Sequence, residues 1–192
     1  DVCSSDLDAG LRSVSNRRVY AIGDAAGGMQ FTHLAGYHAS LVIRSALFRL
    51  PAKTRADHVP RVTYAAPELA QVGPTEAEAR AAGAAVEVAR FDYAGNDRAR
   101  AERATEGFAK VLVGRRGRVM GATVVGAHAG ELIGLWALAV SKGLKIGDVA
   151  GMVAPYPTLG EVSKRAAGAY YTPRLFDNPL VKNAVRLLAR LG

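Results

Sequence analysis

The feature that most constrains the fold is the series of short apolar runs and helical patterns in the second part of the chain. Beyond residue 60, four runs have the length and residue types of strands, and three segments place apolar residues at helical spacing. The strand-like runs are Arg61–Tyr64, Val86–Phe91, Ala109–Val113 and Val119–Val125, and the helical segments are Thr75–Ala82, Glu131–Lys142 and Leu159–Ala169. Strands grouped in this way are typical of an antiparallel sheet with helices against it. The sequence therefore predicts an α+β domain.

Three local signals place the turns and boundaries of this domain. Gly114–Gly117 (Gly-Arg-Arg-Gly) separates the last two runs and predicts a hairpin loop. Thr75 and Glu78 have the spacing of a capping box, in which the threonine caps the helix and the glutamate reaches back. The polar segment Lys53–His58 is the candidate domain boundary, because linkers between domains are typically polar.

The segment before this boundary has a different pattern. Val19–Ile22 is a short apolar run that ends at Gly23, which predicts a buried strand entering a tight turn. Ala25–Gly28 is small and glycine-rich, so its backbone can come close to a ligand. His33–Leu50 keeps an approximate helical period, and Pro51 is expected to end that helix.

Composition excludes several classes of protein. The apolar share of 49% and the charged share of 22% are ordinary for a globular protein, and the sequence lacks the long apolar run of a membrane span. The net charge of +8 comes from scattered basic residues without interleaved aromatic side chains, so we expect no nucleic-acid binding. A single cysteine, Cys3, excludes an internal disulfide framework and favours a cytoplasmic location. No metal site is predicted.

Motifs in both halves of the chain together resemble one family. Val19–Asp24 (Val-Tyr-Ala-Ile-Gly-Asp) resembles the second FAD-binding motif of the pyridine-nucleotide disulfide oxidoreductases, the family of glutathione reductase, dihydrolipoamide dehydrogenase and mercuric reductase. The motifs that resemble the dimerisation domain of that family are Val62–Gly73, Gly107–Val113, Val119–Gly126, Ala129–Ile133 and Pro155–Glu161. They follow the order and spacing of the family from Asp8 to Tyr171.

The resemblance implies a domain plan, cofactors and a partner. Residues 8–52 are expected to end an FAD-binding, Rossmann-like domain, and residues 53–172 to form an α+β dimerisation domain that makes a homodimer. The cofactors implied are FAD and NAD(P)H, with a small-molecule electron acceptor. In the family, the residue at Asp24, after Gly23, accepts a hydrogen bond from a ribityl hydroxyl of FAD. The segment at Gln30, Phe31, Thr32 and His33 lies along the flavin.

The resemblance also points to a catalytic pair with one altered member. The family places a histidine before a Pro-Thr pair as the acid–base group and a glutamate five residues later that orients it. Here Tyr156 holds the histidine position and Glu161 is kept. A phenol has an ordinary pKa of about 10 against about 6.5 for histidine, so Tyr156 would donate a proton but act as a poor base. Paired cysteines near the C-terminus, typical of mercuric reductases, are absent, so the acceptor stays open.

Each of these residues also has an ordinary structural interpretation. Gly23 and Asp24 suit a plain turn, and His33 suits the start of a helix. Tyr156 suits packing in an interface, and Glu161 suits a capping or surface carboxylate at the start of the helix that follows.

The two ends of the chain have separate interpretations. Residues 1–7 match nothing that follows, and we expect a translated adapter joined to a true fragment. Residues 173–192 contain an amphipathic helix, in which Pro179–Leu191 keeps apolar residues at helical spacing while Lys182, Arg186 and Arg190 fall on another face. Such a helix could lie on an anionic membrane, but its short length favours docking on its own domain or on a dimer partner.

Three hypotheses for function remain open on this sequence. The first is the C-terminal part of an enzyme that moves electrons from NAD(P)H through FAD to an acceptor. The chain lacks the family's Gly-x-Gly-x-x-Gly fold, its redox cysteine pair and its nicotinamide domain, so we expect weak FAD binding and no turnover from this chain alone. The second is a dimerisation module without chemistry of its own. The third is a basic protein that binds membranes or nucleic acid.

Overall fold

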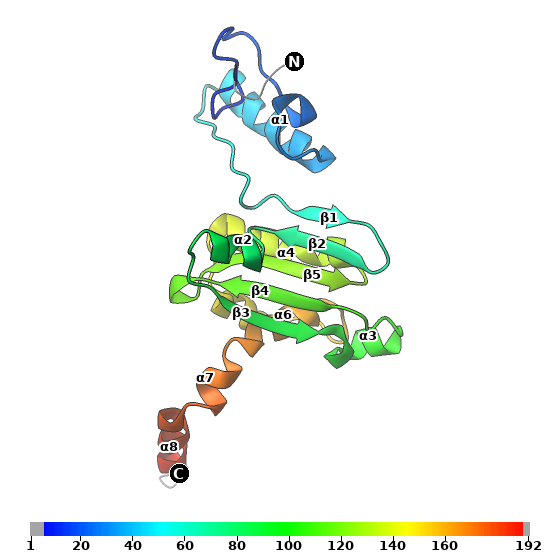
Figure 1. Ribbon diagram of the computed structural model, residues 1–192, viewed down its shortest axis with the longest axis vertical. Helices are drawn as coiled ribbons and strands as arrows, with labels where there is room; N and C mark the ends of the chain where they lie inside the picture. The colour runs from blue at the N-terminus through cyan, green and yellow to red at the C-terminus, as the bar shows by residue number, and fades with distance from the viewer. Residues whose placement is uncertain (1–5, 190–192) are drawn as a thin grey trace. The chain divides into compact units, whose positions relative to one another are not determined.

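The computed structural model describes residues 6–189, which divide into two units, one up to Val59 and one from Pro60 onward (Figure 1). This division falls just after the polar connector at residues 53–58. Residues 1–5, most of the predicted adapter, and residues 190–192, the end of the predicted terminal helix, lie outside the described residues.

The first unit contains a single turn of 3-10 helix, η2 (Gly23–Ala26), and the helix α1 (Thr32–Ala46). Leu34, His38 and Leu41 point inward at helical spacing and are the buried residues of α1. The helix ends before Pro51 because the chain turns at Arg49, which has a positive φ of 54°. The amide of Leu50 then donates to the carbonyl of Arg44 at 3.1 Å.

The predicted strand at Val19–Ile22 is wrong for the described part of the chain. One antiparallel bridge, Arg12 to Tyr20, is the only ladder contact of this segment within residues 6–189. Val19 and Ile22 are exposed. An apolar run becomes a buried strand only where neighbouring strands and a covering layer are present, and the described residues supply one bridging partner.

The second unit is built on a five-stranded antiparallel sheet. Its strands are β1 (Arg61–Thr63), β2 (Glu68–Val72), β3 (Glu87–Asp92), β4 (Phe108–Val113) and β5 (Val119–Gly126), in the spatial order β1-β2-β5-β4-β3. The predicted α+β class with an antiparallel sheet is confirmed. β2 is an addition to the predicted strands, because its polar Glu68 and Gln71 interrupt the apolar run between Pro67 and Gly73.

One face of this sheet forms the hydrophobic core. Alternate residues of neighbouring strands face the same side, and Val72, Ala122 and Val111 are paired across three strands and fully or almost fully buried. The helices α4 (Ala129–Lys142), α5 (Ile146–Ala150) and α6 (Glu161–Ala169) supply the other side of the core (Figure 1). Trp136 of α4 is fully buried, and its indole N–H donates to Ser163 Oγ of α6 at 3.1 Å.

Short helices and tight turns connect the strands. The capping box predicted at α2 (Glu76–Ala81) is confirmed, with both the Thr75 side chain and the Glu78 side chain in their expected bonds. The hairpin between β4 and β5 closes through η4 (Arg115–Gly117). After β3, η3 (Tyr93–Gly95) leads into α3 (Asp97–Ala101), a helix too short to show a period in sequence.

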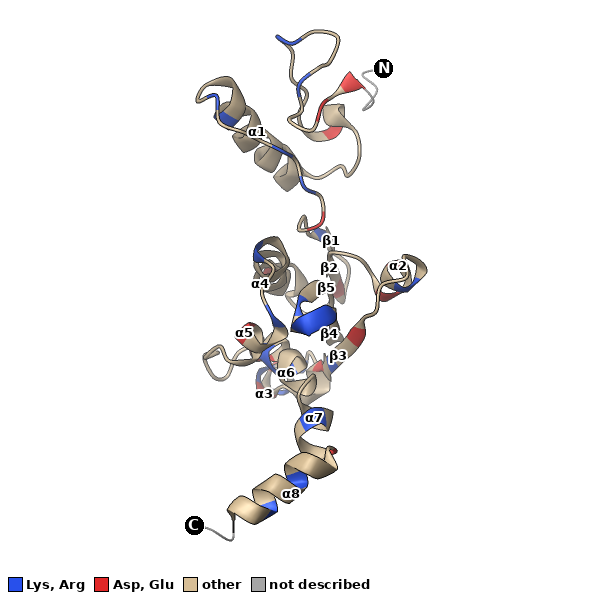
Figure 2. Cartoon of the chain, turned by 90° about the vertical axis from the view of Figure 1, so that its left-hand side faces the viewer, with Lys and Arg blue, Asp and Glu red and all other residues tan. Residues whose placement is uncertain are grey.

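The C-terminal segment forms two helices, α7 (Thr172–Phe176) and α8 (Pro179–Leu188). No described residue of α8 is buried, so docking of this helix on its own domain is not observed within residues 6–189. Lys and Arg residues occur in both units and in these helices rather than in one segment (Figure 2). Among the described helices, none is long and apolar enough to cross a membrane.

We expect the Trp136–Ser163 hydrogen bond to couple α4 and α6. Trp136→Phe should lower the free energy of unfolding by about 1–3 kcal/mol, because it leaves a buried hydroxyl without its partner. Ser163→Ala should also destabilise, and the double variant should cost less than the sum of the two single variants. Urea unfolding followed by circular dichroism measures all four proteins. Additive losses would mean that the bond does not couple the helices.

Candidate functional site

In the first unit, the predicted FAD-binding residues cluster around the turn η2. Gly23 has a positive φ of 59°, and a Cβ at this position would lie 2.8 Å from the Cβ of Ala35. Only glycine fits such a turn at this distance from a helix. The next residue, Asp24, is exposed, and its carboxylate has no hydrogen-bond partner among residues 6–189. The turn therefore exposes the Asp24 carboxylate as a hydrogen-bond acceptor, next to Gly23, whose backbone packs closely against α1.

The second predicted binding segment forms the start of α1. Thr32 is its first residue, and Phe31 is an N-cap whose side chain makes no capping bond. The first amides of a helix have no acceptor within the helix, and they carry the positive end of its dipole. The rings of Phe31 and His33 stack with centroids 5.1 Å apart. This helix start offers N–H donors and a stacked pair of rings to a planar, electron-rich ligand.

His38 connects the turn to the helix, a role that the sequence alone did not indicate. Its Nδ1 accepts a hydrogen bond from the amide of Gly23 at 3.2 Å, and the residue is buried. Burial lowers the pKa of His38, which favours the neutral ring that can accept this bond. The helical period of residues 33–50 predicted that His38 would face inward. It did not predict the hydrogen bond of His38 with Gly23, which lies 15 positions earlier.

In the second unit, the predicted catalytic residues lie around the start of α6. Tyr156 precedes Pro157 through a cis peptide bond and is 68% exposed. Its hydroxyl donates to Asp97 Oδ2 of α3 at 3.1 Å. This hydrogen bond, together with the negative charge of Asp97, raises the pKa of Tyr156. The phenol is thus held protonated in a position open to solvent.

Glu161, the first residue of α6, is placed differently from Tyr156. Its Oε2 is buried without a hydrogen-bond partner among the described residues, and its Oε1 lies 3.9 Å from a guanidinium nitrogen of Arg165. The charge of Glu161 adds to the raised pKa of Tyr156, so the two groups interact electrostatically. The hydroxyl of Tyr156 nevertheless bonds to Asp97 and not to Glu161. One carboxylate oxygen is therefore enclosed without a donor among residues 6–189.

The loop that carries Tyr156 is held by α3. Asn96 is fully buried; its Oδ1 caps α3 by accepting from the amide of Ala99, and its Nδ2 donates to the carbonyl of Thr158 at 3.1 Å. The sequence analysis missed both Asn96 and Asp97 as site residues. An Asn-Asp pair at the start of a helix is a capping signal that could have located α3, but nothing in sequence ties it to residues 156–158.

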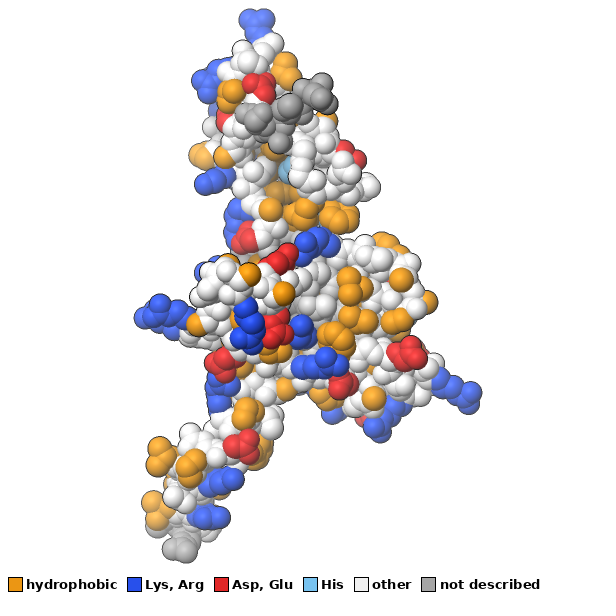
Figure 3. Space-filling model, viewed as in Figure 1, with side chains coloured by type: hydrophobic (Ala, Val, Ile, Leu, Met, Phe, Trp, Pro, Cys, Tyr) orange, Lys and Arg blue, Asp and Glu red, His pale blue; other side chains and the backbone are white. Residues whose placement is uncertain are grey.

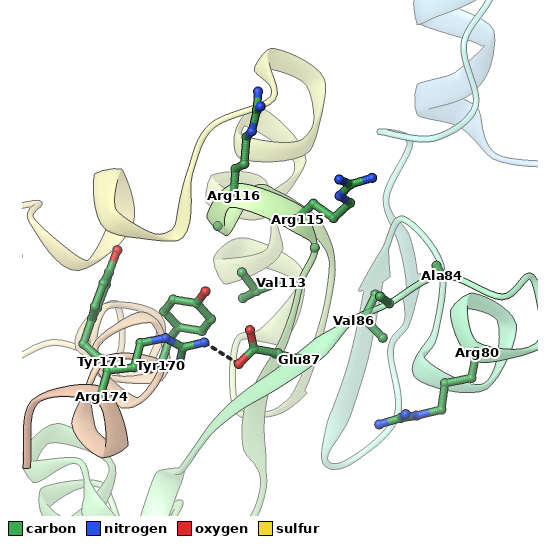
Figure 4. A pocket seen from close by; sticks show the side chains of 13 residues that line it. Arg80, Ala84, Val86, Glu87, Val113, Arg115, Arg116, Tyr170, Tyr171 and Arg174 are labelled. Atoms are coloured by element: carbon green, nitrogen blue, oxygen red, sulfur yellow. Dashed lines mark hydrogen bonds and ion pairs between the residues drawn. The ribbon is translucent and has the colours of Figure 1, made fainter. Parts of the chain in front are cut away.

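Several hollows open on the second unit, one of them beside the predicted site. A hollow of about 390 Å³ borders the loop and is lined by Arg98, Glu102, His128, Glu131, Pro157, Thr158 and Leu159. A larger one, of about 580 Å³, contains none of the predicted site residues. There Arg174 pairs with Glu87 and stacks on Tyr170, while Arg115 and Arg116 extend from the hairpin (Figure 4). Its guanidinium groups are partly paired and solvated, so we assign it no chemistry.

The predicted residues thus fall into two sets on two separate units, the turn and helix start of the first and the α6 loop of the second. Within residues 6–189, no cluster of three or more His, Cys, Asp or Glu side chains could hold a metal ion.

Comparison with known proteins identifies the class of this chain. Residues 59–167 match the family described as "Pyridine nucleotide-disulphide oxidoreductase, dimerisation domain". The match covers more than half of the chain, and the chain belongs to this family. The resemblance seen in the motifs is therefore confirmed.

Particular relatives agree with this class. The chain is 37% identical over 150 residues to a dihydrolipoyl dehydrogenase of Bacillus subtilis, covering 78% of this chain and 32% of the relative. It is 37% identical over 153 residues to a mercuric reductase of Bacillus cereus, covering 79% and 24%. This chain therefore spans about a third or less of the length of these relatives.

Solved structures support the same fold. A crystal structure of LpdA from Mycobacterium tuberculosis superposes with a TM-score of 0.80 at 27% identity, covering 85% of this chain and 36% of that one. The Cu(II) complex of the HOCl-induced flavoprotein disulfide reductase RclA from Escherichia coli gives a TM-score of 0.76 at 27% identity, covering 84% and 37%.

We expect Asp97 to control the ionisation of Tyr156. Asp97→Asn should lower the pKa of Tyr156 toward its ordinary value, because the carboxylate that favours the protonated phenol is gone. The tyrosinate absorbance of Asp97→Asn should therefore appear at lower pH. Subtracting the titration of Tyr156→Phe isolates this residue from the other tyrosines. Asp177→Asn, at an exposed carboxylate near α8, is the control and should leave the curve unchanged; an unshifted Asp97→Asn curve would contradict the assignment.

Proposed function

We propose that this chain is the C-terminal part of an FAD-dependent NAD(P)H oxidoreductase, which passes electrons from NAD(P)H through FAD to a small-molecule acceptor. The observation that carries the proposal is the family match over residues 59–167, with an exposed Asp24 and the N-terminus of α1 in the unit before it. The named relatives are reductases and dehydrogenases. We propose a cytoplasmic location, because one cysteine, Cys3, leaves no pair for an internal disulfide within this chain.

The residues of the first unit fit a flavin. Asp24 would accept a hydrogen bond from a hydroxyl of the cofactor, and Gly23 lets the backbone lie close to it. The amide of Thr32, which begins α1, would donate to the electron-rich edge of the ring system, and His33 lies along the same segment. Gln30 and Phe31 complete this segment. When bound, the flavin supplies the two-electron chemistry that no side chain of this chain can perform.

Tyr156 and Glu161 are proposed to handle protons at the acceptor. Tyr156 is protonated at neutral pH, as an ordinary phenol is, and its bond to Asp97 raises its pKa further, so it can act as a hydrogen-bond donor but not as a base. Glu161 keeps one buried oxygen without a partner. Because this chain itself encloses that oxygen, an internal water is the donor that would satisfy it. We therefore propose donation by Tyr156, rather than removal of a proton, as the role of this loop.

The chemistry of Tyr156 limits which class of electron acceptor the enzyme could reduce. A dithiol substrate needs a base near neutral pH, whereas an acceptor that gains electrons and protons needs a donor. Among the relatives, the printed names include a dihydrolipoyl dehydrogenase, a mercuric reductase and a disulfide reductase. Because a phenol is no base near neutral pH, Tyr156 favours an acceptor that is reduced and protonated over oxidation of a dithiol.

We expect Asp24→Ala to weaken FAD binding in the enzyme made from its complete reading frame. The loss of one charge-assisted hydrogen bond should raise the dissociation constant by roughly tenfold or more, corresponding to about 1.5–3 kcal/mol. Flavin fluorescence during dilution and reconstitution measures it. Asp177→Ala, a second exposed aspartate, is the control and should retain FAD. Unchanged affinity in Asp24→Ala would remove this residue from the site.

A homodimer is proposed from the outer face of α4. The exposed stripe of this helix carries Glu131 near its start, Gly134 and Leu138 in the middle and Lys142 at its end. Leu138 is 53% exposed although the helix is apolar on most sides. An antiparallel copy of the helix would cover Leu138 and bring Glu131 opposite Lys142 of the second copy. Such a self-complementary stripe is what a two-fold interface requires.

We expect Leu138→Glu to convert the dimer to a monomer. It would place two carboxylates in the apolar centre of a two-fold contact, which should weaken association by at least tenfold. Light scattering at several concentrations measures the mass, and circular dichroism checks that the helices remain. Leu47→Glu makes the same change at an exposed leucine of the first unit and should stay dimeric. A dimeric Leu138→Glu would place the interface elsewhere.

A dimerisation module without chemistry is the second candidate. It is favoured by the fact that the matched region is itself a dimerisation domain. The two candidates differ in the sequence that precedes this chain. A nicotinamide-binding domain and a redox cysteine pair there would support the enzyme.

A further inference from the structure

The C-terminal helix α8 is used neither by the family match nor by the proposed reaction. The match ends at residue 167, and α8 begins at Pro179. Asn178 caps it by accepting from the amide of Leu180, and Pro179 occupies the first turn. Asn and Pro at these positions favour helix formation. The sequence thus contains specific helix-start signals for α8, which lies beyond the region matched by the family.

This helix has two distinct faces. At about 100° per residue, its apolar side chains fall on one continuous arc and its polar side chains on the opposite arc. Figure 3 shows hydrophobic and basic side chains on different sides of this terminal segment. The apolar arc contains Leu180, Val181, Ala184, Val185, Leu187 and Leu188, and the polar arc contains Lys182, Asn183 and Arg186.

The apolar face of α8 is uncovered. Leu180 is 76% exposed, Leu188 is 66% exposed, and no residue of the helix is buried. In the preceding helix α7, Leu175 and Phe176 are also exposed. Single exposed apolar residues are ordinary on protein surfaces, but a whole face of a helix marks a site of interaction.

Charge decides which partner fits this face. No acidic residue occurs from Asn178 to Ala189, and the polar arc presents Lys182 and Arg186. A second copy of α8 carries the same Lys182 and Arg186 and no acidic residue, so two copies of this helix packed together would bring like charges close. The partner of α8 must therefore offer an apolar layer to the leucine face and negative charges to Lys182 and Arg186. An anionic phospholipid surface has both properties.

We propose that α8 anchors the protein to the surface of an anionic phospholipid membrane. The helix has 10 residues, or about 15 Å, which is far too short to cross a bilayer. It lies in the plane of the surface, with Leu180, Leu187 and Leu188 among the acyl chains. Lys182 and Arg186 contact the phosphates. Leu175 and Phe176 of α7 add apolar contacts beside it. The anchor is peripheral and reversible.

The test is flotation of the full chain with vesicles of phosphatidylcholine alone or mixed with phosphatidylglycerol. We expect binding to the mixed vesicles and little to phosphatidylcholine. Leu180→Ser and Leu188→Ser should each weaken it by about tenfold, because each removes one leucine from the acyl region without changing charge. Leu47→Ser, at a leucine of similar exposure outside the tail, is the matched control and should bind normally.

A second pair of variants separates the anchor from general attraction of a basic protein. Lys182→Gln and Arg186→Gln should each weaken binding by about fivefold. Arg116→Gln makes the same change of charge at an exposed arginine of the β4–β5 hairpin and should have a smaller effect. Equal effects of all three would show that net charge alone drives binding and would overturn the proposal.

Hydrogen exchange locates the bound segment. The amides of residues 179–188 should gain protection on mixed vesicles. If Leu180→Ser instead lowers the mass of the lipid-free protein in light scattering and leaves flotation unchanged, the apolar face is a contact between two copies and the proposal fails. Neither result bears on FAD binding by Asp24 or on dimerisation through α4, so this inference and the proposed function stand or fall separately.

Discussion

The burial of one face of the sheet beneath α4 and α6 is the constraint on which the second unit depends. Val72, Ala122 and Val111 align across three strands only in the observed register, and a shift by one residue would turn them outward. Gly107 fixes one end of this register: its φ is +117°, and a Cβ there would lie 1.9 Å from the carbonyl oxygen of Val125. The buried bond from Trp136 to Ser163 then ties the two helices to each other.

That packing also positions the proposed site. Because α6 is fixed against the sheet, its first residue Glu161 is held with one oxygen buried. The loop before α6 is tied to α3, since the fully buried Asn96 donates to the carbonyl of Thr158. Tyr156 extends from this loop into solvent. The core therefore determines where a donor is presented, although no core residue takes part in the chemistry.

The sequence predicted those elements that a short local pattern of residues specifies. The runs that became β1, β3, β4 and β5 were visible as apolar segments, and the capping box of α2 was visible as Thr75 and Glu78. The wrong strand at Val19–Ile22 shows the limit, because a buried strand depends on neighbours that the run itself does not specify. α3, with five residues, is shorter than two helical turns and leaves no period to detect.

The same limit applies to the site. Asp24, Tyr156 and Glu161 were found because a family motif surrounds each of them, and their placement in a working site stays a prediction. The partner of Tyr156 was missed, because Asp97 lies 59 residues earlier and meets it only through the fold. His38 was missed as a partner of Gly23 for the same reason. Long-range hydrogen bonds are set by tertiary packing, which has no signature within a short window of sequence.

The replacement of a histidine by Tyr156 changes more than one side chain. In the family arrangement the glutamate orients the histidine, whereas here the Tyr156 hydroxyl bonds to Asp97 and leaves one oxygen of Glu161 without a partner. A buried carboxylate oxygen without a donor is costly, so a fold retains it only where something else satisfies it. A buried water is the usual donor at such an enclosed oxygen. The altered pair is therefore better understood as a protonated phenol beside an enclosed carboxylate than as a weakened base.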